Sequence, residues 1–369
     1  MKITVLQDFL RSGGTERHSI LLSRELAGLG HGARLVTFRP GGRLAASAPA
    51  GHRSLQAIDT GVDWFAPGLL RTVLGDQPDI VLCMGKTANC FAGRIQRRAA
   101  GSGLGTRVVA TLRAGGRLPW FYYSSVRRAS HLVANSRDAA DELVSRHGLD
   151  PGRVSVIRNA LVFPAPAPGR DEAARSRLGA GPASTVLLSV GMFRPEKNQR
   201  ALLEIASGLQ AGLDWRLWFV GDGPERARCE RLAADLGIGG RVSFLGYQPD
   251  PSPFYLSADI AVHVSREEAL SNALIEAQSN GLPVVACRAL GVPECIVEGR
   301  TGFIVAQGDH GGFRAALARL ASDTPAERAL RAGEAREFAR GAFDPRRQVG
   351  AYVRLFESLL RGSAPAARP

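Results

Sequence analysis

Residues 265–286 read SREEALSNALIEAQSNGLPVVA and carry the clearest structural pattern in the chain. The apolar run 260–264 before this stretch predicts a buried strand, and residues 282–286 predict the next one. Between them, Ser271 or Asn272 can cap a helix that ends at residues 280–281, Asn-Gly. The free N–H groups and the positive dipole end of this helix predict a site for an anion such as phosphate.

Two glutamates flank the start of this helix. Glu268 lies in the loop before the helix, and Glu276 lies about a turn and a half inside it. Both side chains can therefore face one polar ligand that carries hydroxyl groups at one end and phosphates in its middle.

Length and composition bound the class of protein. A chain of 369 residues is long for one hydrophobic core, which favours two domains, and an apolar fraction of 45% is ordinary for a globular protein. No apolar run approaches the roughly 18 residues of a membrane span, and residues 3–6 predict a strand in place of a signal peptide. The five cysteines have no metal-binding spacing and are typical of a reducing compartment. We therefore expect a cytoplasmic protein.

The net charge of +13 lies mainly in the first half of the chain. Residues 1–165 hold 22 Lys and Arg against 11 Asp and Glu, whereas the remainder holds 25 against 23. Compositional drift is one explanation, because all but three of the 47 basic residues are arginine. The explanation that we favour is that the N-terminal half faces an anionic membrane surface or a phosphorylated acceptor. Nucleic acid is not expected as a partner, since no nucleic-acid-binding motif accompanies the charge.

Strand-like and helix-like segments alternate along the chain and predict a doubly wound α/β architecture. The turn-rich segment 164–169 interrupts the alternation and predicts a linker between an N-terminal domain, 1–163, and a C-terminal domain, 170–344. A last helix over 345–361 is expected to pack back on the N-terminal domain, and residues 362–369 are expected to be disordered. Two such domains imply a central cleft, with sites at the carboxyl ends of the strands.

The individual elements follow from the same alternation. The main helical patterns of the first half cover residues 15–29, 87–100 and 136–147. The predicted strands cover residues 2–7, 33–38, 79–83, 106–112, 131–134, 154–157, 184–190, 215–220, 241–245, 259–264, 283–286 and 302–305.

Glycine-containing turns follow several of these strands. Gly13 and Gly14 follow the first strand and let the backbone approach a ligand, although such pairs also make simple turns. Gly221 and Gly223, in the sequence VGDGP, indicate either close approach to a bound nucleotide or a plain turn.

A third turn, after Gly191, carries positive charge. Arg194 and Lys197 lie three residues apart in it, and a guanidinium fork with a point charge can converge on a diphosphate. The alternative is a solvated loop with ordinary surface charges.

Together these segments resemble the family 4 retaining glycosyltransferases of the GT-B fold. The resemblance spans most of the chain and rests on motifs that occur in the family's order. They are GGTER with SREL and GLGHGARLV near the N-terminus, the G-x-x-x-x-E-K segment at 191–197, VGDGP, FLGY, the pair Glu268-x7-Glu276, and GLPVVA followed by GVPE and EGxxG.

The resemblance implies a nucleoside-diphosphate sugar on the C-terminal domain and an acceptor on the N-terminal one. Arg194 and Lys197 would hold the diphosphate and neutralise it as the glycosidic bond breaks, in place of a metal. Glu268 would contact hydroxyls of the donor sugar, and Glu276 would accept hydrogen bonds from the ribose. No DxD triplet occurs, so neither a metal nor another cofactor is expected. The other implied donor-binding residues are Gly13, Gly14, Gly191, Gly221, Gly223, Leu270, Ser271 and Asn272.

The sequence departs from the family pattern at three places. Arg113 stands where many relatives carry a histidine near the acceptor, and it can bind an acceptor hydroxyl or phosphate. The family's Asn-Gly hinge appears as Asn159-Ala160. Residues 269–271, Ala-Leu-Ser, replace a Gly-Phe-Gly-like loop, so their side chains are expected to narrow the sugar pocket.

Residues 117–128 place four consecutive aromatics between arginines. This pattern suits an interfacial membrane contact or a lipid-linked acceptor. The alternative is a helix whose aromatics divide between the core and the cleft. Arg117 and Trp120 join Arg113 as candidate acceptor-binding residues.

The expected function is that of a retaining, metal-independent glycosyltransferase. It would move a hexosyl group from a UDP- or GDP-sugar to a saccharide or lipid-linked acceptor of the cell envelope, in the cytoplasm or on the inner face of the plasma membrane. One alternative is a non-catalytic sugar-nucleotide-binding partner subunit, and another is a nucleotide-sugar epimerase. The intact Glu268, Glu276, Arg194 and Lys197 favour the transferase.

Overall fold

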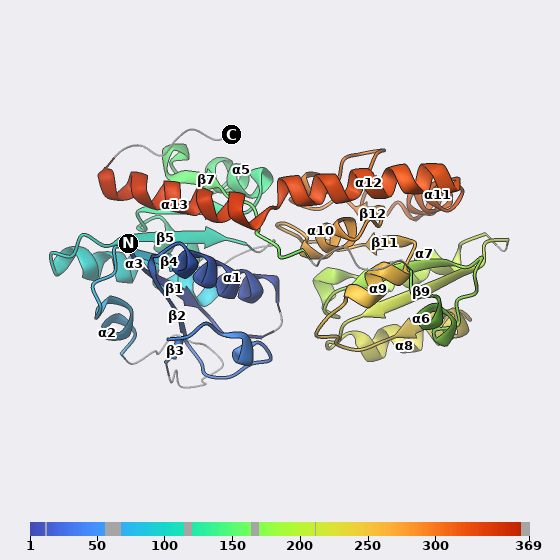
Figure 1. The fold of residues 1–369 in the computed structure, drawn as a ribbon, viewed down its shortest axis with the longest axis horizontal. Helices are drawn as coiled ribbons and strands as arrows, with labels where there is room; N and C mark the ends of the chain where they lie inside the picture. Colours follow the sequence, from blue (N-terminus) through green and yellow to red (C-terminus); the bar gives the residue numbers. More distant parts are fainter. Residues whose placement is uncertain (12, 56–67, 114–119, 164–169, 211, 363–369) are drawn as a thin grey trace. The chain divides into compact units, whose positions relative to one another are not determined.

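The computed structural model describes residues 1–11, 13–55, 68–113, 120–163, 170–210 and 212–362. The chain divides into two units (Figure 1), Met1–Leu161 with Pro345–Pro369, and Val162–Asp344. The predicted linker at 164–169, the tail beyond residue 362 and Arg117 lie outside the described residues.

The first unit contains a seven-stranded parallel sheet in the order β3-β2-β1-β4-β5-β6-β7. Its inner strands are apolar and buried, as expected for a parallel sheet that is covered on both faces. The strands are β1 (Lys2–Gln7), β2 (Gly32–Thr37), β3 (Arg53–Ser54), β4 (Ile80–Cys83), β5 (Arg107–Leu112), β6 (His131–Ala134) and β7 (Val154–Val156).

Helices from both ends of the sequence complete the first unit (Figure 1). The last helix, α13, buries Val349, Tyr352 and Phe356 in the same core as Ile3 and Leu26, so residues far apart in sequence share one core. The helices are α1 (Gly14–Gly28), α2 (Leu69–Leu74), α3 (Lys86–Gly101), α4 (Trp120–Val126), α5 (Arg137–Ser145) and α13 (Pro345–Arg361).

The second unit contains a six-stranded parallel sheet in the order β10-β9-β8-β11-β12-β13. Its strands are β8 (Thr185–Val190), β9 (Trp215–Val220), β10 (Val242–Phe244), β11 (Ile260–His263), β12 (Val284–Cys287) and β13 (Gly302–Val305). Its helices are α6 (Glu172–Arg177), α7 (Gln199–Ser207), α8 (Arg226–Asp235), α9 (Ser252–Ser257), α10 (Asn272–Ser279), α11 (His310–Ala321) and α12 (Pro325–Ala342).

The strand order of each sheet creates a topological switch point. In the second unit the chain adds β9 and β10 on one side of β8 and then β11 to β13 on the other. The connections that leave β8 and β11 therefore diverge, and a crevice opens at the carboxyl ends of these two strands. Ligands of Rossmann-like sheets bind at this place.

The predicted doubly wound α/β architecture is confirmed. Every predicted strand is present, with bounds that differ by two residues at most, but the short edge strand β3 was not predicted. Both residues of β3 are exposed, so no buried alternation marks it in the sequence. No helix among the described residues has the length and apolar character needed to cross a membrane.

Candidate functional site

Two loops of the second unit meet at the switch point between β8 and β11. The first follows β8 and leads through the 3-10 helix η3 (Pro195–Lys197) into α7, and the second follows β11 and leads into α10. The backbone carbonyl of Glu196 in the first loop accepts a hydrogen bond from the Arg266 N–H (2.9 Å) and one from the Ser265 hydroxyl (3.3 Å). These bonds fix the two loops against each other.

Phe193 anchors the first loop in the core. Its side chain is 1% exposed, and its ring centroid lies 5.4 Å from that of Phe219 on β9 and 6.0 Å from that of Phe244 on β10. The rings of Phe219 and Phe244 stack at 5.3 Å. The sequences around VGDGP and FLGY thus supply the packing that holds the charged loop in place.

Lys197 and Glu268 form the centre of the site. The ammonium group of Lys197 donates a hydrogen bond to Glu268 Oε2 and forms an ion pair with it. His263, the last residue of β11, places its Nε2 3.3 Å from the same oxygen. The structure thus brings together one predicted residue from each loop and adds a histidine that was not predicted.

The environment of Glu268 keeps its carboxylate ionised. Burial raises its pKa, but the Lys197 ammonium and the His263 imidazole outweigh burial and lower the pKa to about 2. At neutral pH the site therefore holds a carboxylate and an ammonium that neutralise each other. A polyanion that enters the site competes with Glu268 for Lys197.

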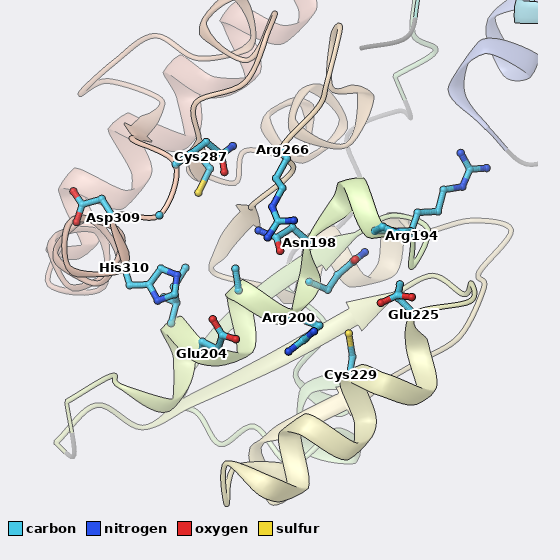
Figure 2. Close-up of a pocket in the computed structure, with 16 residues that line it drawn as sticks. Arg194, Asn198, Arg200, Glu204, Glu225, Cys229, Arg266, Cys287, Asp309 and His310 are labelled. Carbon is cyan, nitrogen blue, oxygen red and sulfur yellow. The ribbon is translucent and has the colours of Figure 1, made fainter. Parts of the chain in front are cut away.

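Arg194 does not join this ion pair. Its side chain is 41% exposed, and its guanidinium lies 3.7 Å from the carboxylate of the neighbouring Glu196. Figure 2 shows Arg194 extending away from the other labelled side chains. Its long side chain is thus available to a ligand at the edge of the loop.

Glu276 is held by a residue from another helix. Tyr255 of α9 is 2% exposed, and its hydroxyl donates a hydrogen bond to Glu276 Oε2 at 3.1 Å. This hydrogen bond between two helices fixes the position of the Glu276 carboxylate.

The start of α10 differs from the sequence prediction in one respect. Ser271, one of the two residues predicted to cap the helix, occupies the N-cap position, but its side chain does not make the capping hydrogen bond that was expected. Ser271 and Leu270 are both buried. The helix ends before Asn280 and Gly281, as predicted.

Close contacts within the protein require glycine at positions 221 and 223. A Cβ on Gly221 would lie 1.9 Å from the carbonyl oxygen of Gly191, and one on Gly223 would lie 2.4 Å from that of Phe193. The absence of a side chain at both positions therefore lets the loop after β9 pack closely against the loop after β8. A Cβ on Gly191 would meet no atom within 4 Å, so the open space beside Gly191 remains for a ligand.

A cavity of about 730 Å³ lies over the start of α7 (Figure 2). Arg200, Glu225 and Cys229 line one part of it, and His310 lines another. Arg194 is the one predicted site residue in its lining; Lys197, Glu268 and Glu276 are not part of it. The ion pair at the switch point and this cavity are therefore neighbouring but separate features.

The predicted residues of the first unit lie on different elements. Gly13 is the N-cap residue of α1, and Gly14 begins that helix. Arg113 follows β5, whereas Trp120 begins α4 and is 80% exposed. Among the residues that the structure describes, no three His, Cys, Asp or Glu side chains are close enough to share a metal ion.

Comparisons with known proteins identify the family. Residues 12–161 match the family described as Glycosyltransferase Family 4, and residues 171–337 match Glycosyl transferases group 1. The lipopolysaccharide core biosynthesis glycosyltransferase LpsE of Rhizobium meliloti is 31% identical over 256 residues, which cover 63% of this chain and 74% of that relative. The chain belongs to glycosyltransferase family 4.

Other relatives of this family 4 glycosyltransferase match over a shorter length. The D-inositol 3-phosphate glycosyltransferase 2 of Catenulispora acidiphila is 38% identical over 207 residues. These residues cover 53% of this chain and 48% of that relative, so the chain spans about half the length of this second protein.

Solved structures show that the glycosyltransferase has the GT-B fold. HepE of Anabaena, solved in complex with UDP, superposes with a TM-score of 0.81 at 20% identity, over 97% of this chain and 100% of HepE. The lipopolysaccharide outer core galactosyltransferase WaaB superposes with a TM-score of 0.73 at 18% identity, over 98% and 99% of the two chains.

The structure adds His263 and Tyr255 to the residues predicted from the sequence. A signal for His263 exists, because a polar residue at the carboxyl end of an apolar strand lies where ligands bind. No comparable signal marks Tyr255, which looks like a core aromatic of α9 and reaches Glu276 only in the folded chain.

Proposed function

We propose that this glycosyltransferase moves a hexosyl group from a nucleoside-diphosphate sugar to an acceptor hydroxyl, with retention of the anomeric configuration and without a metal. The observation that carries this proposal is the cluster of Lys197, Glu268 and His263 at the switch point of the second sheet. Opposite charges from two loops meet there beside the open space at Gly191, where a sugar diphosphate can be bound.

The reaction breaks the bond between the anomeric carbon and a diphosphate oxygen. The nucleoside diphosphate departs with the electron pair, while the acceptor oxygen bonds to the anomeric carbon and gives its proton to an oxygen of the departing diphosphate. Lys197 and Arg194 place positive charge where the leaving group develops negative charge, which is the role that a metal has in other enzymes. Glu268 contacts hydroxyls of the sugar and positions its anomeric carbon.

The rest of the donor is assigned to α10 and its neighbours. Glu276, oriented by Tyr255, accepts hydrogen bonds from the ribose hydroxyls. The backbone N–H groups of Leu270, Ser271 and Asn272 meet the phosphates at the positive end of the helix dipole. Gly13 and Gly14 belong to the loop that we assign to closure over the donor, and Gly221 and Gly223 shape the turn beside Gly191.

Relatives support a choice of donor and acceptor class. HepE was solved with UDP and also with UDP-glucose, which favours UDP over GDP as the donor base of this chain. LpsE and WaaB are named for lipopolysaccharide core synthesis, which favours a saccharide or lipid-linked acceptor of the cell envelope. We assign Arg113, Arg117 and Trp120 to the acceptor, and a peripheral position on the inner face of the plasma membrane to the protein.

A screen of nucleotide sugars tests the donor site. Thermal shifts with UDP- and GDP-sugars should identify one donor, and Lys197→Ala and Glu276→Ala should each weaken its binding by about ten-fold or more, since each removes a charged contact. Lys86→Ala and Glu337→Ala are matched controls, because both residues are exposed and lie outside the site and the cavity. If Lys197→Ala and Glu276→Ala bind the best donor as the parent does, the site assignment is wrong.

The same preparation distinguishes the enzyme from its alternatives. The proposed transferase hydrolyses the donor slowly without an acceptor, and NMR of its glycosylated product should show the anomeric configuration of the donor. Donor binding without hydrolysis or transfer would indicate a non-catalytic partner subunit. Conversion of one nucleotide sugar into another without an acceptor would indicate an epimerase.

A further inference from the structure

A buried polar cluster lies at the carboxyl edge of the sheet in the first unit. Arg113 directly follows β5, Asn135 directly follows β6, and Asn159 is the third residue after β7. His18 comes from α1, and Tyr352 comes from α13. Five elements thus place polar side chains where ligands of parallel α/β sheets bind.

Arg113 is oriented by neutral partners. Its Nη1 donates a hydrogen bond to Asn159 Oδ1 at 2.5 Å, and its Nη2 donates one to the Tyr352 hydroxyl at 2.8 Å. The Nε of this partly buried guanidinium has no partner, and among the described residues Arg113 forms no ion pair. A guanidinium that is held in one direction with no carboxylate beside it retains its full positive charge for a ligand.

His18 supplies a second polar group beside this charge. Its Nδ1 lies 3.1 Å from the Ala160 backbone nitrogen and 3.3 Å from the Ala160 carbonyl oxygen, so the backbone of Ala160 holds the ring in place. Burial and the nearby charge of Arg113 both lower the pKa of His18 well below its ordinary value, so the ring is neutral at pH 7. His18 is 2% exposed, and its Nε2 has no partner among the described residues.

The cluster contains a cationic donor that no acceptor of the described residues satisfies. Asn159 Oδ1 accepts from Arg113 and also from the Asn135 amide at 3.4 Å, so it serves two donors. Arg113 Nε has no partner, and neither has the Nε2 atom of the neighbouring His18. A buried cationic donor without an acceptor is costly, and an oxyanion satisfies it best. The unpartnered Asn135 Oδ1 can accept from a hydroxyl next to that oxyanion.

From these contacts we propose that Arg113, positioned by Asn159 and Tyr352, binds an oxyanion carried by the acceptor substrate. The acceptor is thus not a neutral sugar: it carries a phosphate or carboxylate close to the hydroxyl that receives the hexose. This inference rests on the proposed transferase activity and narrows its acceptor class. The carboxylate of a uronic-acid donor is a second source of the same chemistry, and the experiment separates it from the acceptor.

The test measures the binding of small anionic and neutral probes. With the second unit saturated with UDP, glycerol 3-phosphate and glucuronate should bind to the full chain, whereas glycerol and methyl glucoside should not. Arg113→Gln should weaken binding of the anionic probes by about ten-fold or more, and Tyr352→Phe by a few-fold, because one loses the charge and the other only its orientation. Arg107→Gln is the matched control, since Arg107 is an exposed arginine at the opposite end of the same strand.

Three outcomes would overturn the inference. The first is equal binding of charged and neutral probes, and the second is unchanged binding in Arg113→Gln. The third is a loss confined to turnover of UDP-glucuronate relative to UDP-glucose, which would place the oxyanion on the donor. UDP binding and hydrolysis of UDP-glucose serve as the separate readout of the proposed function. Both should be retained in the control Arg107→Gln, and their absence in the parent would instead refute the transferase.

Discussion

Glu268 links stability and function at the scale of one residue. Its carboxylate has a pKa of about 2 in the folded chain, against an ordinary value of 4.5. Because the folded-state pKa is the lower one, the ion pair with Lys197 stabilises the fold fully above about pH 4.5, and this contribution is lost as the pH falls toward 2.

Glu268→Gln should therefore make the free energy of unfolding less dependent on pH. The difference in unfolding free energy between the parent and this variant is expected to be on the order of 3 kcal/mol near pH 7 and to shrink between pH 4.5 and 2. Denaturant titrations at several pH values measure it. In a Lys197→Met background the same difference should be much smaller, since the main cation is absent. A difference that is constant from pH 2 to 7 would contradict the assigned ion pair.

The residues of the candidate site could be predicted only in part. The charges of Arg194, Lys197 and Glu268 stand in local motifs, so their residue types and spacing indicate a phosphate and sugar site. The contacts of His263 and Tyr255 depend on side chains that approach across strands and helices. Such approach depends on packing, which local spacing in one sequence does not specify.

At the scale of elements, the turns after β8 and β9 make a matched pair of tests. Gly221 has φ of 146°, and its Cβ would clash with the carbonyl of Gly191, so Gly221→Ala is expected to cost about 2 kcal/mol or more of stability. Gly191→Ala meets no protein atom and should change stability by less than about 0.5 kcal/mol. It should nevertheless weaken donor binding by about ten-fold, because its methyl group enters the space that we assign to the donor.

Thermal unfolding and donor titration of both variants separate the two effects. Alanine at Gly239, where the nearest atom to a Cβ lies 3.9 Å away in the second unit, controls for the substitution itself. A Gly191→Ala protein that binds donor as tightly as the parent would refute the placement of the donor beside this loop.

Elements were easier to predict from the sequence than the contacts between them. In the sequence, runs rich in apolar residues indicate strands such as β1 and β9, and an Asn-Gly pair indicates the end of α10. Ser271, one of the two residues predicted to cap α10, occupies the N-cap position, but its hydroxyl makes no capping hydrogen bond, because residue type at an N-cap position does not determine where the hydroxyl points. The edge strand β3 lacked any signal, since two exposed residues pair only when β2 is already in place.

At the scale of the whole molecule, the excess positive charge lies in residues 1–165, which also contain the exposed Trp120. The four aromatics of α4 divide between environments: Tyr122 is buried, Tyr123 stacks on His147 at 3.6 Å, and Trp120 is 80% exposed. A membrane contact at α4 thus reduces to one indole ring, supported by Arg127, Arg128 and the basic surroundings. A single exposed tryptophan with clustered basic residues suits a weak, charge-dependent interfacial contact.

This arrangement predicts sedimentation with vesicles that contain anionic phospholipid and little with neutral phosphatidylcholine. Trp120→Ser and the pair Arg127→Gln with Arg128→Gln should each reduce the bound fraction several-fold, and salt near 0.5 M should do the same, because screening weakens surface attraction. Leu330→Ser is the matched control, since Leu330 is an exposed apolar residue on α12 of the second unit. Binding that is indifferent to anionic lipid, or unchanged in both N-terminal variants, would show that the excess arginine serves another purpose. Recognition of an anionic acceptor at Arg113 would then be the function of this positive charge that the structure supports.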